Sequence, residues 1–152
     1  MTIVVLALAT ADLIFACTYW HGLYGVAPAR VAQNIAAGLL GKRAFAGGSS
    51  TVLLGGLLHY AIMAAMVGVY YLASRRVLAL IERPWLYGAL YGVMLYAVMN
   101  LMVVPLSAAP KAPFVPSWMV GSIVVHLIIG VVTALSARAA LGGRMVVARR
   151  EG

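Results

Sequence analysis

Four apolar runs, each long enough to cross a bilayer as a helix, constrain this chain more than any other feature of its sequence. They cover roughly residues 2–23, 50–73, 84–104 and 117–140. About 20 helical residues span the hydrocarbon core, and open strands would leave backbone groups unpaired in lipid. The sequence therefore predicts an all-α integral membrane protein, built as a bundle of four transmembrane helices.

The composition predicts the same class of protein. Of the 152 residues, 64% are hydrophobic and 9% are charged, and the mean hydropathy is +1.02. A soluble domain has about 25% charged residues, and no stretch of this chain is polar and long enough to form a separate soluble domain. We therefore expect a single membrane domain over residues 1–152.

The segment between the first two apolar runs has the pattern of a short amphipathic helix. Val31, Ile35 and Leu39 recur at every fourth position of a helix that would cover about residues 29–41. Pro28 is a suitable residue to begin it. We expect this helix to lie in the membrane interface rather than to span the bilayer.

Basic residues outnumber acidic residues by 11 to 3, which gives a formal net charge of +8. They stand at the ends of the apolar runs, where they orient helices and contact anionic headgroups, so we expect no nucleic-acid partner. With four spans, both termini share a side with the loop at 74–83. That side carries Arg75, Arg76, Arg83, Arg138, Arg144, Arg149 and Arg150, and the other side carries Arg30, Lys42, Arg43 and Lys111. The larger group predicts that both termini are cytoplasmic.

Three of the four spans carry an ionisable residue near the centre of the bilayer. Asp12 stands at the centre of the first span, and His59 and His126 each stand about 3 Å from the centre of theirs, at about 1.5 Å per residue. The third span supplies Asn100 further along. A charge at this depth costs about 2.5–3.5 kcal/mol, so such residues face protein and pair with one another. We expect Asp12, His59 and His126 to form one interior cluster, in which the carboxylate accepts a hydrogen bond from an imidazole N–H.

The residues around these positions share the inward faces of their helices. Those on the fourth and third spans are Ser122, His126, Thr133, Tyr96 and Asn100. Gly88 and Gly92 form a pair of small residues four positions apart, which allows the backbones of two helices to approach closely. The predicted cluster has two main interpretations, polar contacts that fix helix register and a proton-responsive or ligand-binding site.

A haem b group held between helices is a further alternative. His59 and His126 could be its two axial ligands, because they lie at matching depth on separate spans. A porphyrin needs small residues around it, and Gly55, Gly56 and Gly130 offer some room.

A copper site is the last alternative. The sequences M-A-A-M at 63–66 and M-N-L-M at 99–102 place thioethers about one helical turn apart. Soft sulfur together with imidazole suits Cu(I), whereas methionine is also an ordinary filler of apolar gaps. The main expectation is that the protein has no cofactor and no metal.

Motifs for catalysis are missing from the sequence. It contains no phosphate loop, nucleotide-binding fingerprint, CxxC or HExxH. The single cysteine, Cys17, stands inside an apolar run where its thiolate would be disfavoured. We therefore expect the protein not to be an enzyme.

Several short motifs resemble a group of small bacterial inner-membrane proteins that includes the YagU-type inner-membrane family. They are GGLLHY at 55–60, RPWLYGALYG at 83–92, YAVMNLMVVPLS at 96–107 and VHLIIGVVTALSARAA at 125–140. The resemblance implies a four-span architecture in a bacterial inner membrane. It implies no activity.

Two functions are expected from these features. The first is an accessory or structural subunit of a larger membrane complex, because the chain is small and carries no catalytic motif. The second is a small transporter or channel that uses Asp12, His59 and His126 as a proton-linked site. Four spans are few for a transporter monomer, so this second function requires self-association.

Overall fold

The computed structural model describes residues 1–111 and 114–148, and the side chains of residues 1–111 and 114–142. Its helices run in the order α1 (Thr2–Tyr24), α2 (Pro28–Leu40), η1 (Gly41–Ala46), α3 (Gly48–Ser74), α4 (Ala79–Glu82), α5 (Pro84–Val98), η2 (Met99–Val103), α6 (Val104–Leu106) and α7 (Pro116–Ala148). No strand occurs among these residues. The predicted all-α class is confirmed.

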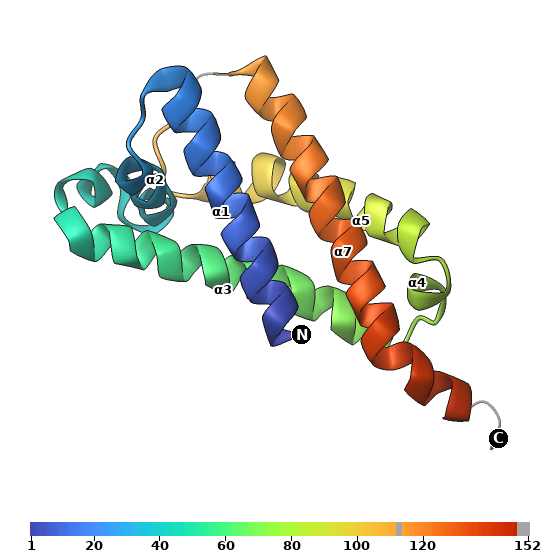
Figure 1. The fold of residues 1–152 in the computed structure, drawn as a ribbon. Coiled ribbons are helices and arrows are strands. Elements are labelled where there is room, and N and C mark those ends of the chain that lie inside the picture. The colour runs from blue at the N-terminus through green and yellow to red at the C-terminus, as the bar shows by residue number, and fades with distance from the viewer. Residues whose placement is uncertain (112–113, 149–152) are drawn as a thin grey trace.

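Four of the helical segments are long and apolar enough to cross a membrane. They are Thr2–Tyr24, Gly48–Ser74, Pro84–Leu106 and Pro116–Gly142. Figure 1 shows the start of α1, the end of α7 and α4 toward one end of the bundle, whereas α2 and η1 lie toward the other end. The chain is therefore a multi-pass membrane protein whose spans alternate in direction, and their apolar surfaces contact the lipid bilayer.

The third span contains a wider helical turn that the sequence pattern did not predict. Residues Met99–Val103 form a π-helical turn between α5 and α6. Pro105 stands two residues after this turn, and proline lacks the amide hydrogen that an α-helix needs at this position. The wider turn lets the helix continue past the proline to Leu106.

The most extensive helix–helix contact among the described residues joins α5 to α7, and three glycines lie in it. A Cβ atom on Gly88 would lie only 2.7 Å from the Cα of Val131, and Gly130 of α7 faces the backbone of both Gly88 and Gly92. The two helices thus touch backbone to backbone. This is the role expected for a pair of small residues four positions apart, and Gly130 is the partner that the sequence pattern did not identify.

The α2 helix packs on α3, which the prediction of an interfacial helix did not include. Ala32, Ala36 and Ala37 are buried, and the backbone of Ala32 lies directly against Gly55 of α3. Gln33 donates hydrogen bonds from Nε2 to the Gly48 carbonyl at 3.3 Å and to Thr51 Oγ1 at 3.4 Å. Of the larger apolar side chains, Leu39 is 65% exposed, and Val31 and Ile35 are only half-buried. Small residues, rather than the bulky ones, dock this helix.

Side chains also join α5 to α3. The Tyr91 hydroxyl of α5 donates a hydrogen bond to the Met66 carbonyl of α3 at 2.6 Å. The Tyr91 ring stands edge-on to the ring of Tyr70, with 4.9 Å between the ring centroids. These contacts lie in the main hydrophobic core, which also contains Met63 and Val67.

We expect Tyr91→Phe to lower the free energy of unfolding by about 1 kcal/mol, because it removes the hydrogen bond to Met66 and keeps the ring. Unfolding in detergent, followed by circular dichroism, measures the change. Tyr87→Phe is the matched control on the same helix, since no hydrogen bond of the Tyr87 hydroxyl is found within the described residues. If Tyr91→Phe and Tyr87→Phe lower the free energy of unfolding equally, the hydrogen bond from Tyr91 to Met66 does not stabilise the fold.

Candidate functional site

Asp12 of α1 and His59 of α3 lie side by side near the middle of their spans. The distance between His59 Nε2 and Asp12 Oδ2 is 3.7 Å, and the two side chains are 13% and 24% exposed. The helices come close here because Ala9, which is fully buried, offers no bulk beyond a methyl group. The separation suits an ion pair when the imidazole is protonated, but it is too long for a hydrogen bond.

The His59 ring has a defined orientation. Its Nε2 lies 2.9 Å from the carbonyl oxygen of Ala9. A carbonyl only accepts, so Nε2 carries the hydrogen and donates it. In the neutral ring, Nδ1 then holds the lone pair and can accept a proton.

His126 of α7 is the third predicted member of the cluster. Its Nδ1 lies 2.8 Å from the carbonyl oxygen of Ser122, one turn earlier, so Nδ1 carries the hydrogen and Nε2 holds the lone pair. The ring stands edge-on to Tyr96 of α5, at 5.7 Å between centroids. The imidazoles of both His59 and His126 are near enough to Asp12 for Coulombic attraction to its carboxylate. The structure therefore brings Asp12 and His59 into direct proximity and places His126 within electrostatic range.

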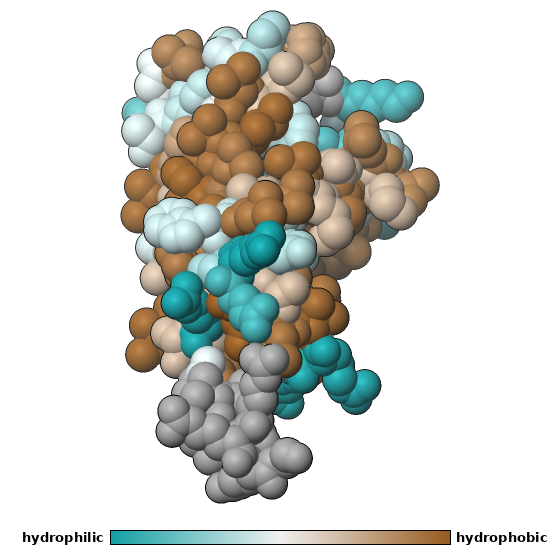
Figure 2. Space-filling model, turned by 90° about the vertical axis from the view of Figure 1, so that its right-hand side faces the viewer, coloured by the Kyte–Doolittle hydropathy of each residue, from teal (hydrophilic) through white to brown (hydrophobic). Residues whose placement is uncertain are grey.

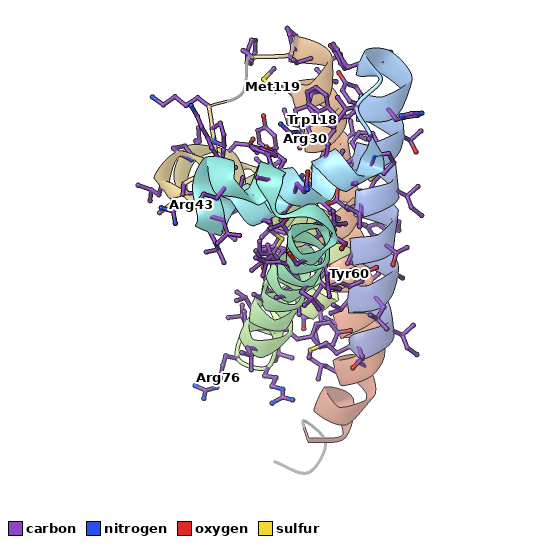
Figure 3. All side chains as sticks on the ribbon, turned by 90° about the vertical axis from the view of Figure 1, so that its left-hand side faces the viewer. Arg30, Arg43, Tyr60, Arg76, Trp118 and Met119 are labelled. Carbon is purple, nitrogen blue, oxygen red and sulfur yellow. The ribbon has the colours of Figure 1, made fainter. Side chains whose placement is uncertain are left out.

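A second polar contact joins α1 and α3 next to this pair. Thr10 Oγ1 and Tyr60 Oη are 2.7 Å apart, and Figure 3 shows Tyr60 between α3 and α1. Sequence reasoning missed both residues. The available signal was that each polar side chain stands in an apolar run within two positions of a predicted cluster residue. The contact lies on the outer side of the two helices, since Thr10 is exposed.

Two of the other predicted residues are not part of the cluster. Asn100 donates a hydrogen bond from Nδ2 to the Tyr96 carbonyl of its own span, at 3.0 Å. No hydrogen bond links Asn100 to Asp12, His59 or His126 among the side chains that the structure describes. Thr133 is fully buried on α7, and its Oγ1 has no hydrogen-bond partner within the described part of the chain.

The space needed for a haem is filled by protein. Gly55 lies against the backbone of Ala32, and Gly130 lies against the backbones of Gly88 and Gly92. Of the three glycines that offered room in the sequence, only Gly56 has open space beside it. A porphyrin between His59 and His126 therefore does not fit this arrangement.

The residues for a copper site are also dispersed. Met63 is buried in the core, whereas Met102 is mostly exposed on the outer surface of the π-helical turn. Within residues 1–111 and 114–142, no group of three or more His, Cys, Asp or Glu side chains is placed to hold a metal ion. Met63 in the core and Met102 on the outer surface therefore do not share one site.

Comparison with known proteins adds no assignment. No family model, no curated protein and no solved structure matches this chain. The resemblance to the YagU-type inner-membrane family therefore stays a prediction.

Proposed function

We propose that this protein is a small oligomeric transporter or channel that takes up and releases a proton at Asp12 and His59. The observation that supports this proposal best is the 3.7 Å contact between a carboxylate and an imidazole near the middle of two membrane spans. Ionisable residues are costly at this depth and mark ion pathways and proton relays in many membrane proteins. The larger number of basic residues on the side of the termini supports an orientation with both termini in the cytoplasm. The resemblance to small bacterial inner-membrane proteins supports a location in a bacterial inner membrane.

The chemistry of the pair favours one exchangeable proton. An ionised Asp12 beside a neutral His59 leaves a net negative charge in a medium of low dielectric, which is unfavourable. Addition of one proton makes the pair neutral overall, either as carboxylate with imidazolium or as carboxylic acid with imidazole. His59 Nδ1 can receive that proton while Nε2 stays bonded to the Ala9 carbonyl.

His126 provides a second position for the proton. Its Nε2 holds a lone pair because Nδ1 donates to Ser122. The carboxylate of Asp12 attracts a positive charge on either imidazole. In this proposal, a proton bound at Asp12 and His59 passes to His126 on α7 as it crosses the centre of the membrane.

The outer side of the site supports assembly into an oligomer. Thr10 and Tyr60 form their hydrogen bond on an exposed surface, and Asp12 is 24% exposed beside them. Polar groups are unfavourable against lipid tails, and polar side chains hydrogen-bond across helices in membrane proteins. We propose that a second copy of the chain covers this surface.

A proton-flux assay in liposomes tests the proposal. Purified protein is reconstituted with an internal pH-sensitive dye, and a potassium gradient with valinomycin drives proton entry. We expect the wild-type protein to acidify the lumen, and both Asp12→Asn and His59→Gln to reduce the flux to that of protein-free liposomes. His21→Gln is the matched control, because His21 is exposed at the end of α1 and bonds only to its own turn at Val26.

Any of three results would contradict the proposed function. One is a wild-type flux equal to that of empty liposomes. Another is a flux that Asp12→Asn leaves unchanged although the variant folds and reconstitutes to the same level. Equal losses in His21→Gln and His59→Gln would also contradict it, since only His59 lies beside Asp12.

The exposed polar surface also supports a second candidate, an accessory subunit of a larger membrane complex. Thr10 and Tyr60 could meet a different membrane protein rather than a second copy of this chain. Purification from native membranes in mild detergent distinguishes the accessory subunit from the self-associating transporter or channel. A stoichiometric complex with a larger membrane protein supports the accessory role, and a complex that contains only this chain contradicts it.

A further inference from the structure

An apolar groove runs along the outer surface of α7 beside the start of α5, away from the site at Asp12. Its lining residues are Trp85, Leu127, Ile128, Val131, Val132 and Leu135. The groove has a volume of about 360 Å³. The five residues from α7 run from Leu127 to Leu135, eight steps of about 1.5 Å each, so the groove extends about 12 Å along that helix. No polar side chain lines it.

Two arginines stand at one end of this groove. Arg83 comes two residues before Trp85, and Arg138 follows Leu135 by three residues, which is almost one helical turn. Both arginines are exposed, and α4, which ends just before Arg83, packs against α7. Figure 2 shows this side of the molecule, with hydrophilic side chains gathered toward its lower end below a broad apolar area. Trp85 is 68% exposed at the same level.

The two arginines have no carboxylate partner within the described part of the chain. The ion pair found among the described side chains is that of His59 with Asp12. Glu82 precedes Arg83 and is exposed, but it lies within 4.0 Å of neither guanidinium group. Within these described residues, both guanidinium groups are therefore available to bind an anion.

We propose that this groove and its two arginines form a binding site for an anionic phospholipid. One acyl chain lies in the groove along Ile128 and Leu135, and the phosphate accepts hydrogen bonds from Arg83 and Arg138. Trp85 stands where aromatic side chains usually meet the headgroup region. An acyl chain matches a wall without polar groups, and a phosphate matches paired guanidinium groups. The site is independent of the proposed proton pathway.

Quenching of Trp85 fluorescence by brominated lipid tests the site. In a Trp20→Phe/Trp118→Phe background, Trp85 is the one remaining tryptophan. Bromines on the acyl chain quench an indole that they touch. We expect brominated phosphatidylglycerol to quench Trp85 at a concentration about tenfold lower than brominated phosphatidylcholine, because anionic headgroups are attracted by each nearby arginine.

Matched variants separate this site from a general attraction to anionic lipid. Arg83→Gln/Arg138→Gln is expected to abolish the preference for phosphatidylglycerol. Arg75→Gln/Arg76→Gln removes the same charge just after α3, and this double variant is expected to keep the preference for phosphatidylglycerol. Ile128→Trp, which fills the groove, is expected to lower the amount of phosphatidylglycerol that the protein retains in native mass spectrometry, with the other tryptophans unchanged.

Three outcomes would overturn the proposal. The first is equal quenching by the two brominated lipids. The second is an equal loss of the preference for phosphatidylglycerol in Arg83→Gln/Arg138→Gln and in Arg75→Gln/Arg76→Gln. The third is a dimer that Ile128→Trp dissociates, because a second copy of the chain would then occupy the groove. The native mass spectrometry uses protein that keeps Trp20 and Trp118. Its measure of retained phosphatidylglycerol therefore does not depend on the folding of the Trp20→Phe/Trp118→Phe variant.

Discussion

Gly130→Ala is expected to lower the free energy of unfolding by about 3 kcal/mol or more, at the upper end of the usual range for overpacking. A Cβ atom at this position would fall on the backbone of Gly88 and Gly92. Side chains can rotate away from an added methyl group, but backbone atoms cannot. The variant must therefore move α5 away from α7, and the contacts along this whole interface weaken together.

Unfolding of the purified protein by increasing mole fractions of dodecyl sulfate, followed by circular dichroism, measures this loss. Gly68→Ala is the matched control, because Gly68 stands in α3 and an added Cβ would meet no atom within 4 Å. Alanine is favoured over glycine in a helix by about 1 kcal/mol. The control should therefore be as stable as the wild type or more stable. A Gly130→Ala variant of wild-type stability would show that α5 and α7 do not meet through their backbones.

Gly55→Ala is expected to detach α2 from α3, with a loss of about 2 kcal/mol in the stability of that contact. The backbone of Ala32 occupies the position where the new methyl group would stand. Separation of the helices would also lengthen the bond from Gln33 Nε2 to the Gly48 carbonyl, which is already 3.3 Å. Faster amide hydrogen exchange in α2, with little change in α5 and α7, is the expected measurement.

The neighbouring residue provides the control for this prediction. Gly56 is on the same helix and at the same depth, but an added Cβ would meet no atom within 4 Å. We expect Gly56→Ala to leave hydrogen exchange in α2 unchanged. If Gly55→Ala and Gly56→Ala accelerate exchange equally, the effect comes from α3 itself and the docking of α2 on α3 is wrong.

Part of the candidate site could be predicted from the sequence because depth in the membrane follows from position along a span. Asp12 and His59 stand near the centres of their runs, and a buried charge needs a partner. The direction of each polar group could not be predicted in this way. Asn100 is also a polar residue in an apolar run, but its side-chain amide donates a hydrogen bond to the Tyr96 carbonyl of its own span.

The docking of α2 shows a second limit of the sequence pattern. The spacing of the large apolar residues predicted an amphipathic interfacial helix, whereas the buried residues on the side of α3 include Ala32 and Ala36. Alanine gives a weak signal in an apolar chain, because it is common on every helix face. Its importance here depends on the glycine opposite, Gly55, which is 23 positions away in the sequence.

The sequence by itself determined that the chain forms four membrane-spanning helices, since lipid offers no partner for backbone hydrogen bonds and sets the length of an apolar run. It also placed Asp12 and His59 at a common depth. Only the tertiary structure decided which helices touch and how each is rotated. Lipid tails cover an apolar face as well as another helix does, so the arrangement depends on close contacts of small residues such as Gly130 with a neighbouring backbone.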